Sequence, residues 1–170
     1  MGNLFKDAAR RIEASPFIIP ITFVFAAMFV VASGIAIEDY STTLAGYRLV
    51  PTAKVNDWVL PLVALLPQVG QIGFAYLFAT DTNKRWAVLI AFVLHVIDVY
   101  TDVRFKAAGQ GLDVWLIALV ESEVIFTLGS ELMLAASFGM LIRLFPSAIV
   151  QIGQALRRAW EALVPGDSQE

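Results

Sequence analysis

The sequence contains no cysteine and only one histidine among its 170 residues. Without cysteine the chain cannot form a disulfide, an iron–sulfur cluster, a covalent haem linkage or a cysteine zinc site. Retinal is not expected either, because its Schiff base needs a lysine inside a helix and every lysine (6, 54, 84 and 106) lies outside the apolar segments. Few cofactors remain compatible with the sequence, and a divalent cation is one of them.

Charged residues are also scarce. They make up 16% of the chain, against 58% hydrophobic residues, and the mean hydropathy is +0.72. Soluble domains are roughly 25% charged and 45–50% apolar, so this composition excludes an ordinary soluble domain. A net charge of −3 offers no basic surface to a nucleic acid. The phosphate-loop, nucleophile-elbow, dinucleotide and His-Glu-x-x-His motifs are all missing, which favours a role other than catalysis.

Four segments are apolar over the roughly 20 residues that a membrane-spanning helix needs. They cover about residues 16–37, 58–80, 86–103 and 112–145. The last is longer than a bilayer requires, so it must tilt, kink or project. Residues 38–57 are expected to form the one sizeable loop, with a short hairpin or flap. The sequence therefore predicts an all-α polytopic integral membrane protein, a four-transmembrane-helix bundle formed by residues 1–170 as a single domain.

The two ends of the chain have amphipathic patterns. In about residues 3–14 and 147–164, apolar residues recur at helical spacing beside basic ones. Helices of this kind lie in the membrane interface, with basic residues toward the lipid headgroups. We therefore expect an interfacial helix at each terminus and the lipid bilayer as a partner.

Lysine and arginine counts predict the orientation, because short cytoplasmic loops carry the excess of these residues. The two termini and the 81–85 loop share one side, which holds eight of them: Lys6, Arg10, Arg11, Lys84, Arg85, Arg143, Arg157 and Arg158. The other side holds four: Arg48, Lys54, Arg104 and Lys106. Both termini are therefore predicted to be cytoplasmic.

Ionisable and amide side chains interrupt three of the predicted spans. Such residues are costly in a bilayer and usually face the interior of a bundle or a cavity. His95, Asp98 and Asp102 share one helix face at i, i+3 and i+7. Counting residues from the helix ends places most of the set within about two turns of one level, with Glu131 deeper, near Lys84 or Arg85. The candidate polar core or ion path comprises Gln68, Gln71, His95, Asp98, Asp102, Glu121, Glu123 and Glu131.

Small residues form a separate stripe on the fourth span. Ser122, Gly129 and Ala136 repeat every seven residues, a pattern typical of a helix-packing seam. Together with the polar face, the stripe indicates that this helix has protein on most sides. The sequence therefore favours self-association into a homo-oligomer, or association with other membrane subunits.

Three functions are compatible with the polar residues. In the first, the chain is a small subunit of a membrane assembly, and the polar residues make contacts between helices. In the second, it is a small ion or proton channel or transporter that uses His95, Asp98, Glu121 and Glu123, since histidine titrates near neutrality. In the third, which we favour least, it is a metal-binding membrane enzyme with His95, Asp98 and Glu121 as candidate ligands.

Overall fold

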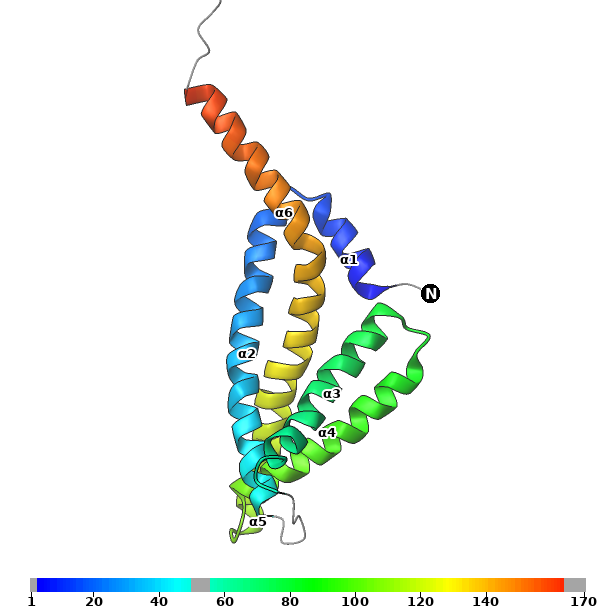
Figure 1. Cartoon of the computed structure of the whole chain (residues 1–170), viewed down its shortest axis with the longest axis vertical. Coiled ribbons are helices and arrows are strands. Elements are labelled where there is room, and N and C mark those ends of the chain that lie inside the picture. Colours follow the sequence, from blue (N-terminus) through cyan, green and yellow to red (C-terminus); the bar gives the residue numbers. More distant parts are fainter. Residues whose placement is uncertain (1–2, 50–55, 164–170) are drawn as a thin grey trace, which may run out of the picture.

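The computed structural model describes residues 3–49 and 56–163, and this part of the chain consists of helices joined by short turns, with no strand. It forms five continuous helices, of which four are long and apolar enough to span a membrane (Figure 1). The prediction of an all-α fold is therefore confirmed, and four helices have the length and apolar composition that the predicted spans require. The large apolar side chains exposed along these spans match the surface that lipid would cover.

The first span, α2, is longer than predicted. It covers Ile18–Arg48 without interruption, whereas the sequence pattern ended it at residue 37. Residues 38–48 are therefore helical, and the predicted loop or hairpin over 38–57 is wrong for them; residues 50–55 lie outside the described part of the chain. The hydroxyl groups of Ser41 and Thr42 donate to carbonyl oxygens four residues earlier. Both hydroxyls therefore find a hydrogen-bond partner within the helix itself.

Two helices, α3 and α4, form a hairpin. α3 covers Leu60–Thr80 and α4 covers Arg85–Lys106, close to the predicted 58–80 and 86–103. The short turn between them is stabilised by Asp81, whose carboxylate accepts the backbone N–H of Asn83. Figure 1 shows the hairpin packed against α2 at one end of the bundle and leaning away from it toward the 81–84 turn.

The fourth span is one long helix with an irregular centre. It begins as α5 (Leu112–Glu121), continues as the π-helical segment η1 (Ser122–Leu132) and ends as α6 (Met133–Leu163). The prediction of a separate interfacial helix over 147–164 is wrong, because the tail up to Leu163 continues α6 and projects beyond the bundle (Figure 1). Residue 164 lies outside the described part. Pro146 is accommodated inside this helix without ending it.

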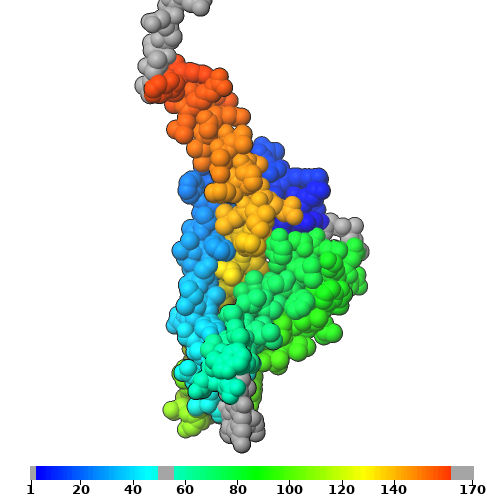
Figure 2. All heavy atoms as spheres, in the orientation of Figure 1, coloured from blue at the N-terminus to red at the C-terminus, as the bar shows by residue number. Residues whose placement is uncertain are grey.

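The N-terminal helix α1 (Leu4–Glu13) matches the helix predicted over 3–14, but its inner face packs on protein. Phe5 and Ala9 are buried against α6, and the Phe5 ring stacks on Tyr76 of α3 at a centroid distance of 5.7 Å. Figure 2 shows α1 seated in the notch between α6 and the α3–α4 hairpin. Asn3 caps the helix by accepting the backbone N–H of Lys6.

Candidate functional site

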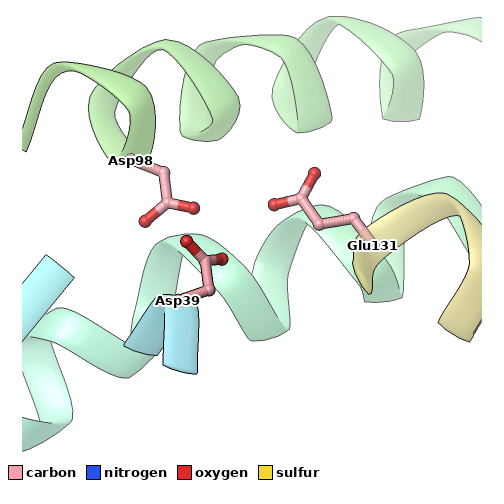
Figure 3. A group of neighbouring side chains, drawn as sticks. All are labelled: Asp39, Asp98 and Glu131. Atoms are coloured by element: carbon pink, nitrogen blue, oxygen red, sulfur yellow. The ribbon is translucent and has the colours of Figure 1, made fainter. Parts of the chain in front are cut away.

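Three buried carboxyl groups from three different helices meet inside the bundle. Asp39 comes from α2, Asp98 from α4 and Glu131 from η1, and one oxygen of each lies within 4.8 Å of the others. Their exposed fractions are 1%, 3% and 6%. Figure 3 shows the Glu131 carboxyl group pointing toward Asp39 and Asp98. We call these three residues the carboxylate cluster.

Thr43, one turn after Asp39, joins the cluster to a fourth carboxyl group. Its hydroxyl lies 2.8 Å from Asp98 Oδ1 and 2.9 Å from Asp102 Oδ1, and it accepts the Gln68 amide at 3.4 Å. A hydroxyl has one proton and two lone pairs, so Thr43 can donate fully to only one of the two aspartates. The other aspartate completes a hydrogen bond if it is protonated and donates to Thr43. Both contacts of Thr43 are therefore hydrogen bonds when either Asp98 or Asp102 carries a proton.

A second branch leads from Asp98 to the exposed side of the bundle. Gln71 donates its amide to Asp98 Oδ2 at 3.0 Å, and its carbonyl oxygen accepts from His95 Nδ1 at 3.2 Å. His95 Nε2 then lies 3.2 Å from both carboxylate oxygens of Glu123. A neutral histidine that donates from Nδ1 has no proton on Nε2. The contact with Glu123 therefore needs one more proton, on either His95 or Glu123.

Asp39 keeps unused bonding capacity. Its Oδ1 is fully buried and has no partner among the described residues. An unsatisfied buried acceptor costs roughly 1–3 kcal/mol. A hydrogen-bond donor or a cation would satisfy this acceptor.

The positive charge near these groups is limited. In the described part of the chain, no lysine or arginine forms an ion pair with Asp39, Asp98, Asp102 or Glu131. Lys106 instead pairs with Glu121 at 3.0 Å and lies over the Phe126 ring, 4.3 Å from its centroid. The buried carboxyl groups thus depend mainly on protons, hydrogen bonds or a bound cation for their stabilisation.

The structure brings most of the candidate residues together. Their hydrogen bonds and the carboxylate cluster link residues from α2, α3, α4 and η1. We call this set the polar network: Asp39, Thr43, Gln68, Gln71, His95, Asp98, Asp102, Glu123 and Glu131.

Two expectations about acidic residues are wrong. Glu121 lies outside the polar network in its ion pair with Lys106, so the trio of His95, Asp98 and Glu121 is not assembled as one metal site. Glu131 does not pair with Lys84 or Arg85 but joins Asp39 and Asp98. For Glu131, the π-helical winding from residue 122 explains why an α-helical projection fails, because i→i+5 bonding changes the angle between successive side chains.

Sequence reasoning did not include Asp39 and Thr43 in the site. Both lie in the predicted loop over 38–57, because charged and hydroxyl residues follow residue 37. The available signal was their spacing: Asp39, Thr43 and Gly46 share one face of a continued helix, and all three are buried.

The small-residue stripe lies largely inside the chain. Ser122 is buried, and a Cβ on Gly129 would approach Ile35 Cδ1 of α2 to 3.1 Å. At least part of the stripe therefore packs against α2 of the same molecule.

An open cavity of about 560 Å³ adjoins the polar network. It lies between the α3–α4 hairpin and the η1–α6 helix, with Phe5 of α1 in its wall. Its polar wall residues are Gln71, His95, Thr127 and Glu131. We call it the α1-side cavity. A second cavity, of about 600 Å³, lies between α4 and α5 and shares His95 with the first. His95 therefore borders both.

Comparison of the chain with protein-family models, with curated proteins and with solved structures gives no match.

Proposed function

We propose that the protein is a small multi-pass membrane transporter that carries protons, alone or in exchange for another cation, by means of the polar network. Both termini are cytoplasmic in this proposal, as the lysine and arginine counts predict. Asp39, Asp98 and Glu131 form the central binding site. Asp102 and the His95–Glu123 pair provide further groups that exchange protons with it.

The observation that carries the proposal is the convergence of the three cluster carboxyl groups within 4.8 Å. At an effective dielectric constant of about 20, two unit negative charges at such a distance repel by roughly 3 kcal/mol. Three ionised groups without a lysine or arginine partner would therefore destabilise the bundle. Protons or a bound cation remove that repulsion, so binding and release of positive charge is the chemistry to which this site is suited.

The arrangement of the network supports transport over a purely structural role. Polar groups that only hold helices together can be paired with a group of opposite charge, as Glu121 is with Lys106. The cluster instead gathers groups of one sign and leaves Asp39 Oδ1 without a partner among the described residues. Intramembrane carboxyl groups of this kind commonly serve ion pathways and proton relays.

The proposal is tested by reconstituting the purified protein into liposomes that contain a pH-sensitive dye. A potassium diffusion potential then drives protons inward. We expect wild-type vesicles to acidify faster than empty ones, and Asp98→Asn to reduce the protein-dependent rate at least about tenfold, equivalent to about 1.4 kcal/mol. The matched control is Asp113→Asn, which makes the same change at an exposed residue of α5.

Two results would contradict the proposal. One is a wild-type rate equal to that of empty liposomes under inward and outward potentials. The other is an unchanged rate in Asp98→Asn protein that reconstitutes normally. Repeating the assay with Ca²⁺, Mg²⁺ and Mn²⁺ gradients separates proton transport from transport of a hard cation, which oxygen ligands would also suit.

The orientation is tested separately by cysteine labelling, for which this cysteine-free chain needs no background substitutions. Asp57 and Asn83 are exposed at opposite ends of the α3–α4 hairpin. A membrane-impermeant thiol reagent added to intact cells should label Asp57→Cys and leave Asn83→Cys unlabelled. The reverse pattern would overturn the cytoplasmic location of the termini.

A second proposal is that the chain is a subunit of a homo-oligomeric or mixed membrane assembly. The observation that favours it is the projecting end of α6, where Leu156 and Trp160 are 66% and 68% exposed. Native mass spectrometry after gentle extraction tests this. A mass equal to the monomer alone would contradict it.

A further inference from the structure

The α1-side cavity is apolar over most of its wall. Phe5, Phe78 and Phe92 contribute aromatic rings, and small residues such as Ala75 and Ala91 leave the space open. Its volume of about 560 Å³ lies within the range of small-molecule sites, which is roughly 300–1,000 Å³. The cavity can therefore hold an organic molecule with a substantial apolar body.

One carboxyl group connects this cavity to the carboxylate cluster. Glu131 is in the cavity wall, and the exposed fraction of its surface is only 6%. One of its carboxyl oxygens lies within 4.8 Å of carboxyl oxygens of Asp39 and Asp98. None of the hydrogen bonds or ion pairs found in the described part of the chain uses its side chain. Glu131 is thus an unpartnered acidic residue in the wall of an apolar cavity, with its carboxyl group turned toward the carboxylate cluster (Figure 3).

The charge of the cavity wall selects among possible occupants. None of the described wall residues is a lysine or an arginine, and Glu131 is the acidic residue among them. An organic anion would meet a carboxyl group with no cationic partner. A cation would pair with Glu131 and lie among aromatic rings, which attract cations through their faces.

We infer that the α1-side cavity binds a lipophilic organic cation, such as a quaternary ammonium or phosphonium compound, with its positive charge beside Glu131. The inference rests on the proposed function, because it names the cation that is exchanged for protons. Binding proceeds with a balanced exchange: the cation pairs with the Glu131 carboxylate, and the proton that Glu131 held leaves to the solvent. One positive charge enters for each that leaves.

Other charged groups around Glu131 set the conditions for this exchange. Asp39 faces it from α2, Asp98 and Asp102 from α4, and Glu123 from its own helix. His95 of α4 is in the same cavity wall. The excess of acidic groups opposes a bare Glu131 charge, so Glu131 should give up its proton when the incoming cation replaces it.

Tetraphenylphosphonium is the probe that tests this inference. Equilibrium dialysis against the purified protein in lipid nanodiscs measures its binding, with empty nanodiscs as the blank. Tetraphenylborate has the same shape and the opposite charge. We expect saturable binding of the cation, no saturable binding of the anion, and release of about one proton per bound cation in weakly buffered solution.

Glu131→Gln should weaken cation binding at least about tenfold, because it removes the charge and keeps the shape. The matched control is Glu161→Gln, in the exposed end of α6, which should bind like wild type. Ala75→Phe narrows the cavity without changing a charge and should also lose binding. This variant keeps the test decisive if Glu131→Gln does not fold.

The results separate the inference from the proposed function. Equal binding of the phosphonium and the borate, or cation binding that survives Glu131→Gln, would overturn the inference and indicate an apolar lipid site. Absence of phosphonium binding while wild-type liposomes still carry protons would overturn the inference alone. Phosphonium binding that depends on Glu131, in a protein that moves no protons across liposomes, would support the cavity assignment and contradict the proposed function.

Discussion

The two ends of the bundle differ in polarity and in packing. Around Asp39, α2, α3 and α4 meet closely, and Gly46 of α2 touches the backbone of Thr101 in α4. Toward the 81–84 turn, the α3–α4 hairpin leans away from α2 (Figure 1), and the α1-side cavity lies there between the hairpin and the η1–α6 helix. The first region is buried and hydrogen-bonded, whereas the second is apolar and open.

This contrast has a physical reason. Apolar side chains gain little by leaving lipid for a helix interface, because lipid tails are as apolar as they are. Polar side chains gain more, because a hydrogen-bond partner on another helix satisfies a group that would otherwise lie unsatisfied in hydrocarbon. The polar network therefore fixes how the helices approach one another. The apolar region is free to open, and an open apolar region beside a charged cluster is suited to binding a molecule.

The largest expected effect comes from Asp39, the network residue that the sequence pattern assigned to a loop. Asp39→Asn should lower proton transport to the level of empty liposomes, because the cluster loses one of the three acidic groups that hold exchangeable positive charge. The control is Glu38→Gln, the exposed neighbour. Equal rates for Asp39→Asn and wild type would show that Asp39 has no part in transport and would contradict its place in the central binding site.

The next effect concerns packing in the polar region. A Cβ on Gly46 would collide with the Thr101 carbonyl, which is backbone and cannot rotate away. Gly46→Ala should therefore destabilise the protein by about 2 kcal/mol, measured by thermal unfolding in detergent. Gly34 of the same helix has open space around its Cα, and Gly34→Ala should stabilise by about 0.5–1 kcal/mol. Similar losses for both variants would refute the close approach of α2 and α4.

A smaller effect is expected in the apolar region, where α1 packs against the bundle mainly through Phe5. Phe5→Ala should weaken docking of α1 by about 1 kcal/mol, because the helix is terminal and part of the contact is replaced by lipid. Trypsin should then cleave at Arg10 and Arg11 several times faster than in wild type. Leu4→Ala, at a 55% exposed residue, should leave cleavage unchanged. Equal protection of Phe5→Ala would mean that α1 is held by other contacts.

The smallest effect should come from Glu121. This residue pairs with Lys106 outside the polar network, so Glu121→Gln should leave the proton transport rate within experimental error of wild type. Glu123→Gln, two residues away, should slow transport severalfold because it removes the partner of His95. A loss of transport in Glu121→Gln would show that Glu121 belongs to the polar network and that its boundary is drawn incorrectly here.

The sequence predicted the fold more completely than the site. Long apolar runs indicated the four spans, because the bilayer fixes the length of such segments. The i, i+3, i+7 spacing of His95, Asp98 and Asp102 indicated their shared face, because α4 is a regular helix. Asp39 was missed because polarity after residue 37 resembles a loop, although here it marks a helix that continues beside polar partners.

The grouping of acidic residues on the fourth span could not be predicted from spacing alone. A projection at 3.6 residues per turn assumes a regular α-helix, and η1 is not one. It therefore could not indicate that Glu131 meets Asp39 and Asp98. Which helices approach one another also depends on contacts far apart in the chain, such as Thr43 with Asp98.

The central claim is that the buried carboxyl groups hold protons and can release them. Infrared spectroscopy of the protein in lipid tests it directly, because a protonated carboxyl group has a C=O stretching band that an ionised one lacks and that shifts in D₂O. We predict such a band at neutral pH, reduced in both Asp39→Asn and Glu131→Gln relative to wild type and unchanged in Glu38→Gln. A wild-type spectrum with no protonated-carboxyl band, in the absence of a bound metal cation, would contradict the account.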